Sequence, residues 1–181
     1  MKLKSVCVFC GSQKGNNQNY IDAAEDVGEL IAQKDFRLVY GGGHVGLMGI
    51  MADSCIALGG EVIGVIPKSL LERELSHKKL TELRVVDSMH ERKALMENLS
   101  DIVVAMPGGF GTLDELNEIL TWKQLGFHQM PIYILNIDGY YDLFLKFVQR
   151  AVDDGFISKE HQKYLIICNT VKELSELLSS N

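Results

Sequence analysis

The fold is decided by residues 101–115, which read DIVVAMPGGFGTLDE. An apolar strand breaks at Pro107, the chain crosses three glycines, and a helix is expected to begin at Thr112. A continuously apolar strand is typical of a parallel sheet, because such strands are covered on both faces. This stretch therefore predicts one strand-turn-helix unit of an α/β protein.

The same unit recurs along the chain. Short runs rich in Val and Ile predict strands at residues 5–9, 36–40, 61–66, 83–86, 101–106, 131–135 and 165–168. Between them, apolar residues at three- and four-residue spacing predict helices at residues 20–34, 47–58, 89–99, 112–125, 141–152 and 171–178. This alternation predicts right-handed crossovers and a doubly wound parallel sheet with helices on both faces, with ligands at the carboxyl ends of the strands.

Length and charge narrow the class of protein. A chain of 181 residues fits one domain, residues 1–181. The net charge of −6 argues against a nucleic-acid polymer as partner, since such partners select a basic surface. No apolar run approaches the roughly 18 residues that span a bilayer, and the first residues do not resemble a signal peptide. We therefore expect a cytoplasmic protein with no membrane partner.

Neither the cysteines nor the histidines predict a metal site. Cys7 and Cys10 have C-x-x-C spacing, but they fall in a buried strand whose alternation sends them to opposite faces. A redox or metal role for this pair is the minor alternative. The four cysteines are too few for a disulfide scaffold, and the five histidines show no paired ligand spacing. The sequence predicts reduced thiols and no metal.

Three predicted strands run into turns of glycine or small residues, at residues 10–12, 41–43 and 107–112. All three turns lie at strand carboxyl ends, which suggests that a ligand rests there against bare backbone. The third turn predicts a phosphate site, because glycines expose amides at a helix start and Thr112 adds a hydroxyl donor. The alternative is a tight turn without a ligand.

Two motifs that the sequence lacks limit which phosphate ligands it is expected to bind. The sequence around the third turn has no P-loop lysine, which argues against triphosphate chemistry. It also has no dinucleotide fingerprint, which argues against a nicotinamide cofactor. A monophosphate ligand with no cofactor fits better.

Glu115 and Arg92 are the charged residues that invite a functional interpretation. Thr112 and Glu115 have the spacing of a capping box, so a structural role for Glu115 stays open. Arg92 falls within the apolar stripe of the helix at 89–99, where a guanidinium must be paired, line a polar cavity, or extend past its neighbours to water. Lys93, beside that stripe, is expected either to contact phosphate or to lie in solvent.

Two motifs resemble one known family. Residues 107–115 resemble the P-G-G-x-G-T-x-x-E signature of the LONELY GUY proteins, the cytokinin-activating phosphoribohydrolases, and residues 89–93 resemble their M-H-x-R-K signature. The similarity also covers the turns at 8–12 and 40–43 and the strand exit at 66–67, so it extends through about Trp122.

The resemblance implies a Rossmann-like homodimer that cleaves N6-modified adenosine 5′-monophosphates to free base and ribose 5-phosphate. It implies that Arg92 and Glu115 are catalytic. It further implies that the substrate is contacted by Glu74, Lys93, Gly108, Gly109, Phe110, Gly111, Thr112, Leu113, Asp114 and Thr121.

Two other functions stay open at this point. One is a general AMP or nucleoside-monophosphate glycosylase, and the other is a nucleotide-binding module that breaks no bond. Met89, Met96, Trp122 and Phe127 are either ordinary core or the wall of a pocket for an apolar N6 group. An older label of the family, lysine decarboxylase, fits poorly, because no lysine is singled out for a Schiff base.

Overall fold

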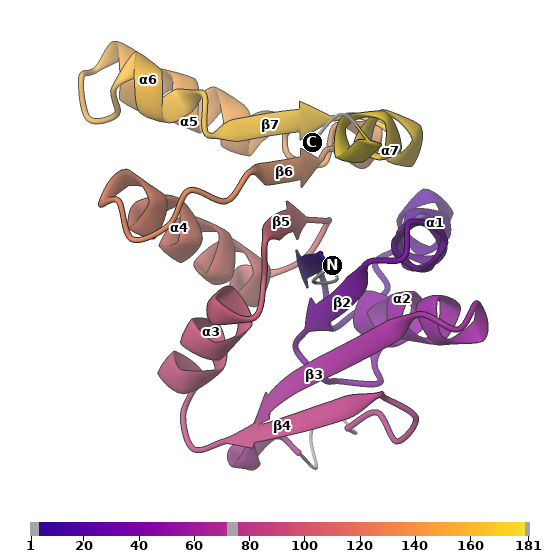
Figure 1. The fold of residues 1–181 in the computed structure, drawn as a ribbon. Helices are drawn as coiled ribbons and strands as arrows, with labels where there is room; N and C mark the ends of the chain where they lie inside the picture. Colours follow the sequence, from indigo (N-terminus) through magenta and orange to yellow (C-terminus); the bar gives the residue numbers. More distant parts are fainter. Residues whose placement is uncertain (1–3, 72–75, 180–181) are drawn as a thin grey trace.

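Seven parallel strands form one sheet in the computed structural model, which describes residues 4–71 and 76–179 (Figure 1). The order across the sheet is β4-β3-β2-β1-β5-β6-β7. All seven predicted strands are confirmed, with bounds β1 Ser5–Phe9, β2 Arg37–Tyr40, β3 Glu61–Pro67, β4 Glu82–Val86, β5 Ile102–Ala105, β6 Ile132–Leu135 and β7 Leu165–Cys168.

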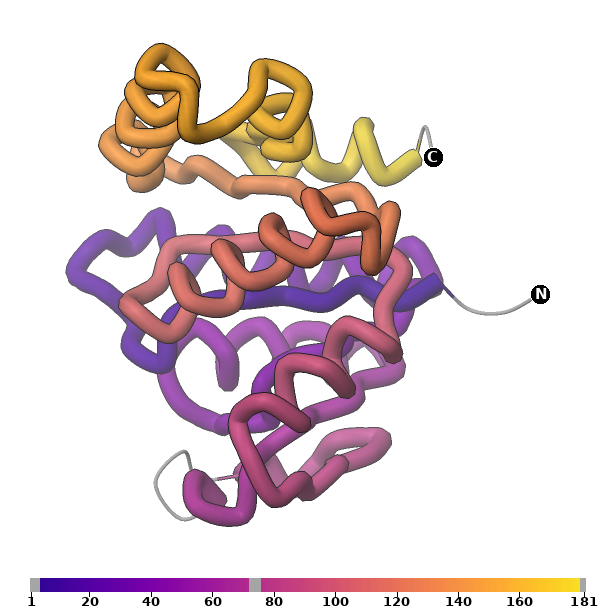
Figure 2. Tube along the Cα trace, turned by 90° about the vertical axis from the view of Figure 1, so that its left-hand side faces the viewer, coloured from indigo at the N-terminus to yellow at the C-terminus, as the bar shows by residue number. Residues whose placement is uncertain are grey.

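Helices cover both faces of the sheet, as the doubly wound prediction requires. One face packs against α1 (Gln18–Gln33), α2 (Gly46–Ala57) and α7 (Val171–Ser179). The other packs against α3 (Met89–Asn98), α4 (Phe110–Gln124) and α5 (Asp142–Asp153), the face toward the viewer in Figure 2. Three short elements complete the described chain: η1 (Lys68–Leu70), η2 (Ile137–Gly139) and α6 (Lys159–Gln162).

The direction of winding reverses at β1. From β1 the chain moves outward to β4, and α3 then returns it to β5 on the other side of β1. A reversal of this kind opens a crevice at the carboxyl ends of the two central strands. Backbone bonds hold its turns together: the Gly11 amide donates to the Pro107 carbonyl at 3.0 Å, and the Leu47 amide donates to the Gly11 carbonyl at 3.0 Å.

The predicted start of α4 is wrong by two residues. The helix begins at Phe110, and its N-cap is Gly109, which makes no side-chain capping bond. Thr112 is instead buried inside the first turn and packs against Gly108. A methyl group added to Gly108 would lie 2.1 Å from the Thr112 hydroxyl. The capping-box role of Glu115 is therefore excluded, because Glu115 lies further along the helix.

The alternation predicted for β1 is confirmed by its two cysteines. Cys7 belongs to the core cluster under α3, α4 and α5, whereas Cys10, just beyond the strand, belongs to the cluster under α1 and α2. Cys7, Cys10, Cys55 and Cys168 are all buried free thiols. Within the described residues, no helix combines the length and the apolar character needed to cross a bilayer.

Candidate functional site

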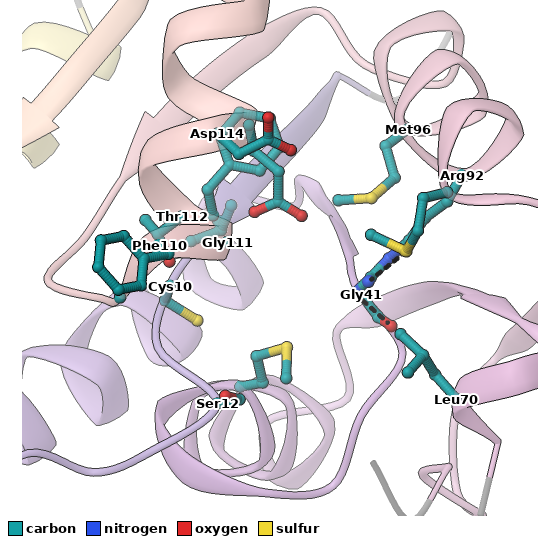
Figure 3. A pocket seen from close by; sticks show the side chains of 16 residues that line it. Cys10, Ser12, Gly41, Leu70, Arg92, Met96, Phe110, Gly111, Thr112 and Asp114 are labelled. Carbon is teal, nitrogen blue, oxygen red and sulfur yellow. Dashed lines mark hydrogen bonds between the residues drawn. The ribbon is translucent and has the colours of Figure 1, made fainter. Parts of the chain in front are cut away.

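A cavity of about 220 Å³ opens at the carboxyl ends of β1 and β2 and at the start of α4 (Figure 3). In the close-up, Arg92 and Met96 of α3 face Gly111, Thr112 and Asp114 of α4 across the opening. The three small-residue turns predicted from the sequence all contribute lining residues: Cys10 and Ser12 from the first, Gly41 from the second, and residues 109–112 from the third.

Gly109 and Gly111 leave bare backbone on the cavity. A methyl group built on either residue would meet no protein atom within 4 Å, and neither residue has a left-handed backbone. The packing of the chain therefore does not require glycine at these two positions. Since the first amides of a helix have no partner within it, the start of α4 offers donors and partial positive charge to an anion. The phosphate site predicted from the sequence falls at this helix start.

Arg92 is buried, with 5% of its surface exposed, and it lines the cavity. Its Nη2 donates to the carbonyl of Gly41 at 3.0 Å. Gly41 is required by this contact, because a methyl group there would lie 1.9 Å from Nη2. The alternative in which Arg92 extends to water is excluded, and the guanidinium is instead a fixed cation in the cavity wall.

Glu115 lines the same cavity from α4. Burial raises the pKa of the Cys7 and Cys10 thiols, and the negative charge of Glu115 raises both further. The positive charge of Arg92 acts in the opposite direction on the pKa of Cys7. Arg92 and Glu115 both line the cavity beside β1, so the structure brings the two predicted catalytic residues to one place.

Lys93 does not line the cavity, and most of its side chain is shielded from solvent. Its Nζ lies 3.0 Å from the Asp114 carboxylate and 3.0 Å from the Glu118 carboxylate, and its side chain is 10% exposed. Burial alone would lower the pKa of Lys93, but the bonds to Glu118 and Asp114 outweigh it and raise that pKa. Lys93 is thus a charged link between α3 and α4, while Asp114 also lines the cavity.

The remaining predicted contacts are divided between the cavity and other surfaces. Thr112 is buried in the cavity wall, and Phe110 lies on the rim with 93% of its surface exposed. Leu113 packs into the core instead. Thr121 is exposed on α4, where its hydroxyl donates to the Asn117 carbonyl at 2.8 Å and lines a separate groove against α5. Glu74 lies outside the described residues.

The apolar part of the cavity was predicted only in part. Met89 and Met96 line it, whereas Trp122 packs in the core and Phe127 is exposed. Sequence reasoning missed Met48 of α2 and Leu70 of η1, which also line the cavity. No local pattern marks these two residues, because only the fold brings them to the strand ends.

The chain matches one family model and is similar in sequence to several known proteins. A family model described as "Possible lysine decarboxylase" matches residues 48–178. The chain is 46% identical over 177 residues to cytokinin riboside 5'-monophosphate phosphoribohydrolase LOG3 of Arabidopsis thaliana, covering 98% of this chain and 82% of that relative. It is also 46% identical over 173 residues to the LOG protein of the same description from Oryza sativa subsp. japonica, covering 96% and 72%.

Solved structures with the same fold are more distant in sequence. The molybdenum cofactor binding protein from Rippkaea orientalis matches with a TM-score of 0.75 and 22% identity, covering 99% of this chain and 98% of that one. The molybdenum cofactor carrier protein from Chlamydomonas reinhardtii matches with a TM-score of 0.75 and 20% identity, covering 99% and 98%. At such identities these neighbours establish the α/β fold alone.

Proposed function

The chain belongs to the LONELY GUY (LOG) family of cytokinin riboside 5'-monophosphate phosphoribohydrolases, and on that premise we propose that it hydrolyses N6-modified adenosine 5′-monophosphates to free base and ribose 5-phosphate. One observation carries the proposal. Glu115 and Arg92 line the same cavity as the bare helix start at Gly109 and Gly111, so an anion site, a carboxylate and a guanidinium share one space.

The substrate phosphate binds at the start of α4. The amides of residues 110–112 have no partner within the helix, and the helix dipole favours negative charge there. Thr112 lines the same cavity. A phosphate held at this point directs the ribose toward Glu115, which is one helical turn further along α4.

Cleavage of the N-glycosidic bond builds positive charge on the ribose as the base departs. The Glu115 carboxylate stabilises that charge or orients the attacking water, and Arg92 orients the Glu115 carboxylate or the phosphate. The bond from C1′ to the base nitrogen breaks with its electron pair on the base. Water supplies the oxygen that joins C1′ and the proton that the base takes up, so no cofactor is needed.

The base lies against an apolar wall of Met48, Leu70, Met89 and Met96. Methionine side chains are flexible and polarisable, so such a wall adapts to apolar groups of different shape. This lining supports a substrate with an apolar N6 substituent over unmodified AMP. The general nucleoside-monophosphate glycosylase is the second candidate, since the phosphate and ribose contacts are the same for both.

The description "Possible lysine decarboxylase" does not fit the cavity. Among the described residues, its lining includes no lysine. Lys93, which follows the cavity residue Arg92, would be the candidate for a Schiff base. It is paired with Asp114 and Glu118, and these bonds raise its pKa. A lysine that forms a Schiff base needs a lowered pKa, so the residues present do not fit pyridoxal chemistry.

The active form is a homodimer in which α5 contacts a second copy of the chain. Leu143 and Phe147 lie four residues apart on α5 and are 78% and 68% exposed. Phe147 lines the same groove as Thr121, so a second copy there brings Thr121 into an interface. Phe147→Glu should convert the protein to a monomer, as measured by light scattering after gel filtration. A variant that stays dimeric would exclude this face.

The free cysteines support a reducing, cytoplasmic location for the protein. All four cysteines are buried and free, and burial raises the pKa of each, so they persist as neutral thiols. Immunoblotting of fractionated cells checks this location, and recovery in a secreted fraction would contradict it.

Product analysis by chromatography tests the function. The purified protein is incubated with AMP and with isopentenyl-AMP, beside the Glu115→Gln variant. We expect isopentenyladenine from the modified nucleotide and much less adenine from AMP. Comparable release from both would favour the general glycosylase. Release from neither, with thermal stabilisation by AMP, would make the protein a nucleotide-binding module.

A further inference from the structure

A second cluster of titratable side chains lies beside the Gly41–Gly43 turn. The Asp53 carboxylate of α2 is 3.0 Å from Nε2 of His44 through one oxygen and 3.0 Å from Nε2 of His77 through the other. The two imidazole rings are 4.3 Å apart between centroids. The His77 side chain is 1% exposed, whereas His44 and Asp53 are about half exposed.

The ligand atoms of these three residues lie within 4.8 Å of one another, close enough to hold a cation. The protonation of His77 argues against that use. Its Nδ1 accepts the Lys79 amide at 3.1 Å, so the ring proton is on Nε2, the atom that faces Asp53. A metal-bound histidine has the opposite arrangement, in which the second ring nitrogen donates. Lys78 and Lys79 add positive charge beside the ring.

The cluster instead fastens two chain segments that are far apart in sequence. The His77 amide donates to the Gly42 carbonyl at 3.1 Å, and Ser76 forms a bridge with Gly43. The His77 ring then reaches across to Asp53 on α2. The end of the β3–β4 connection is thereby attached to the turn that follows β2.

This turn is part of the cavity wall. The Gly41 carbonyl accepts from Arg92, so the position of the turn sets the position of the guanidinium. The same β3–β4 connection begins with η1, whose Leu70 lines the cavity. The Ser76 amide donates to the Leu71 carbonyl at 3.3 Å, which links the His77 segment to the residue beside Leu70. A change in the His77 contact therefore reaches the cavity through Gly41 and through Leu70.

We propose that His77 and Asp53 form a clasp, a pair of bonded side chains that positions the Gly41–Gly43 turn and Leu70 for nucleotide binding. This inference rests on the proposed function. His77 is a positioning residue in this role, because it acts through Gly41 and Leu70 and does not line the cavity.

The clasp depends on a neutral His77. Burial lowers the pKa of His77, and the nearby charges of His44 and Lys79 lower it further, while the bond to Asp53 opposes them. For Asp53, burial would raise the pKa, but the bonds from His44 and His77 outweigh it. If His77 Nδ1 were protonated, its N–H would face the backbone N–H of Lys79, and the hydrogen bond between them would be lost. The clasp is therefore closed above the unfolded pKa of histidine, 6.5, and opens as the pH falls toward the folded value.

Two substitutions at His77 separate its two ring nitrogens. Asn places a polar atom near the position of Nδ1 and does not reach Asp53, whereas Gln places an amide near the position of Nε2 and donates to Asp53 without titrating. We expect His77→Asn and Asp53→Ala, which removes the acceptor oxygen, to raise KM for isopentenyl-AMP about tenfold. His77→Gln should stay within about twofold of the wild type, and so should Asp26→Ala, a change at an exposed acid on α1 that serves as the matched control.

The pH dependence gives a readout that general destabilisation would not move. KM is measured at about pH 7.5 and about pH 5.5. The substrate phosphate titrates equally for every variant, so a larger rise for the wild type than for His77→Gln supports the clasp. A wild-type KM in His77→Asn, or equal pH dependence of all variants, overturns it.

Calorimetry with AMP separates the clasp from the proposed function. Weaker AMP binding in His77→Asn, with no base released by the wild type, would support the clasp and refute the hydrolase. Base release and AMP binding that are both unaffected in His77→Asn would refute the clasp alone.

Discussion

Glu115 is the residue whose role is most directly testable, because its alternative as a helix cap is excluded by the start of α4 at Phe110. Glu115→Gln keeps the shape of the side chain and removes its charge. We expect turnover of isopentenyl-AMP to fall by about 10² to 10⁴-fold, the usual contribution of a positioned carboxylate. The melting temperature and the affinity for ribose 5-phosphate should change little, as measured by calorimetry. Wild-type turnover would remove Glu115 from the mechanism.

Gly41 and Gly111 both line the cavity, but a methyl group would have a different effect at each position. A methyl group at Gly41 collides with the Arg92 guanidinium at 1.9 Å, whereas one at Gly111 meets no protein atom. Gly41→Ala should therefore displace Arg92 and lower kcat about 10²-fold. Gly111→Ala should stabilise α4 by roughly 0.5–1 kcal/mol and still raise KM, because the methyl group occupies space left for the nucleotide.

Thermal melts and steady-state kinetics on both glycine variants check this contrast. If Gly111→Ala left KM unchanged, the bare backbone at the start of α4 would have no ligand to accommodate. If Gly41→Ala kept the wild-type kcat, the bond from Arg92 to the Gly41 carbonyl would be dispensable.

The helix pair α3 and α4 is joined by Lys93, which contacts Asp114 and Glu118. Lys93→Met keeps the aliphatic stem and leaves the partly buried Glu118 without its cation. We expect a loss of about 1–2 kcal/mol, seen as a fall in melting temperature of roughly 2–8 °C. If Lys93 instead contacts the substrate, as the family resemblance implies, KM would rise and the melting temperature would stay unchanged. Differential scanning calorimetry with kinetics separates the two.

Local patterns predicted the elements well and their ends less well. Apolar runs and helical spacing are properties of neighbouring residues, so each of the seven strands was predicted within one or two residues of its bounds. The start of α4 was not, because Thr112 and Glu115 also match a capping box, and only the packing of Thr112 onto Gly108 decides between them. The four-residue α6 is too short to show a period.

The site was predictable where one segment carries its chemistry. The stretch at 107–115 and the position of Arg92 within an apolar stripe were both visible in the sequence. The acceptor of Arg92 was not, because Gly41 lies 51 residues away and only the return of α3 toward β5 brings the two together. The same reason hides Met48, Leu70 and the contact between Asp53 and His77, which are 24 residues apart.

The whole molecule should lose stability in alkali, because its thiols are buried. Burial raises the pKa of Cys55 and of Cys168 to about 11 each, from an unfolded value of 9.0. A group whose pKa is higher in the folded state releases its proton first in the unfolded state, so its contribution is complete below pH 9.0 and declines as the pH rises toward 11. Each thiol adds a slope of up to about 1.4 kcal/mol per pH unit.

Melting temperatures of the wild type and of Cys55→Ala, taken at intervals between about pH 8 and about pH 10.5, measure this slope. Cys55→Ala should begin less stable, because a buried sulfur is lost, and should decline less steeply. Every lysine and tyrosine titrates alike in both proteins, so the difference in slope belongs to one thiol. Parallel curves would mean that the region around Cys55 admits water and that α2 opens locally before the molecule unfolds.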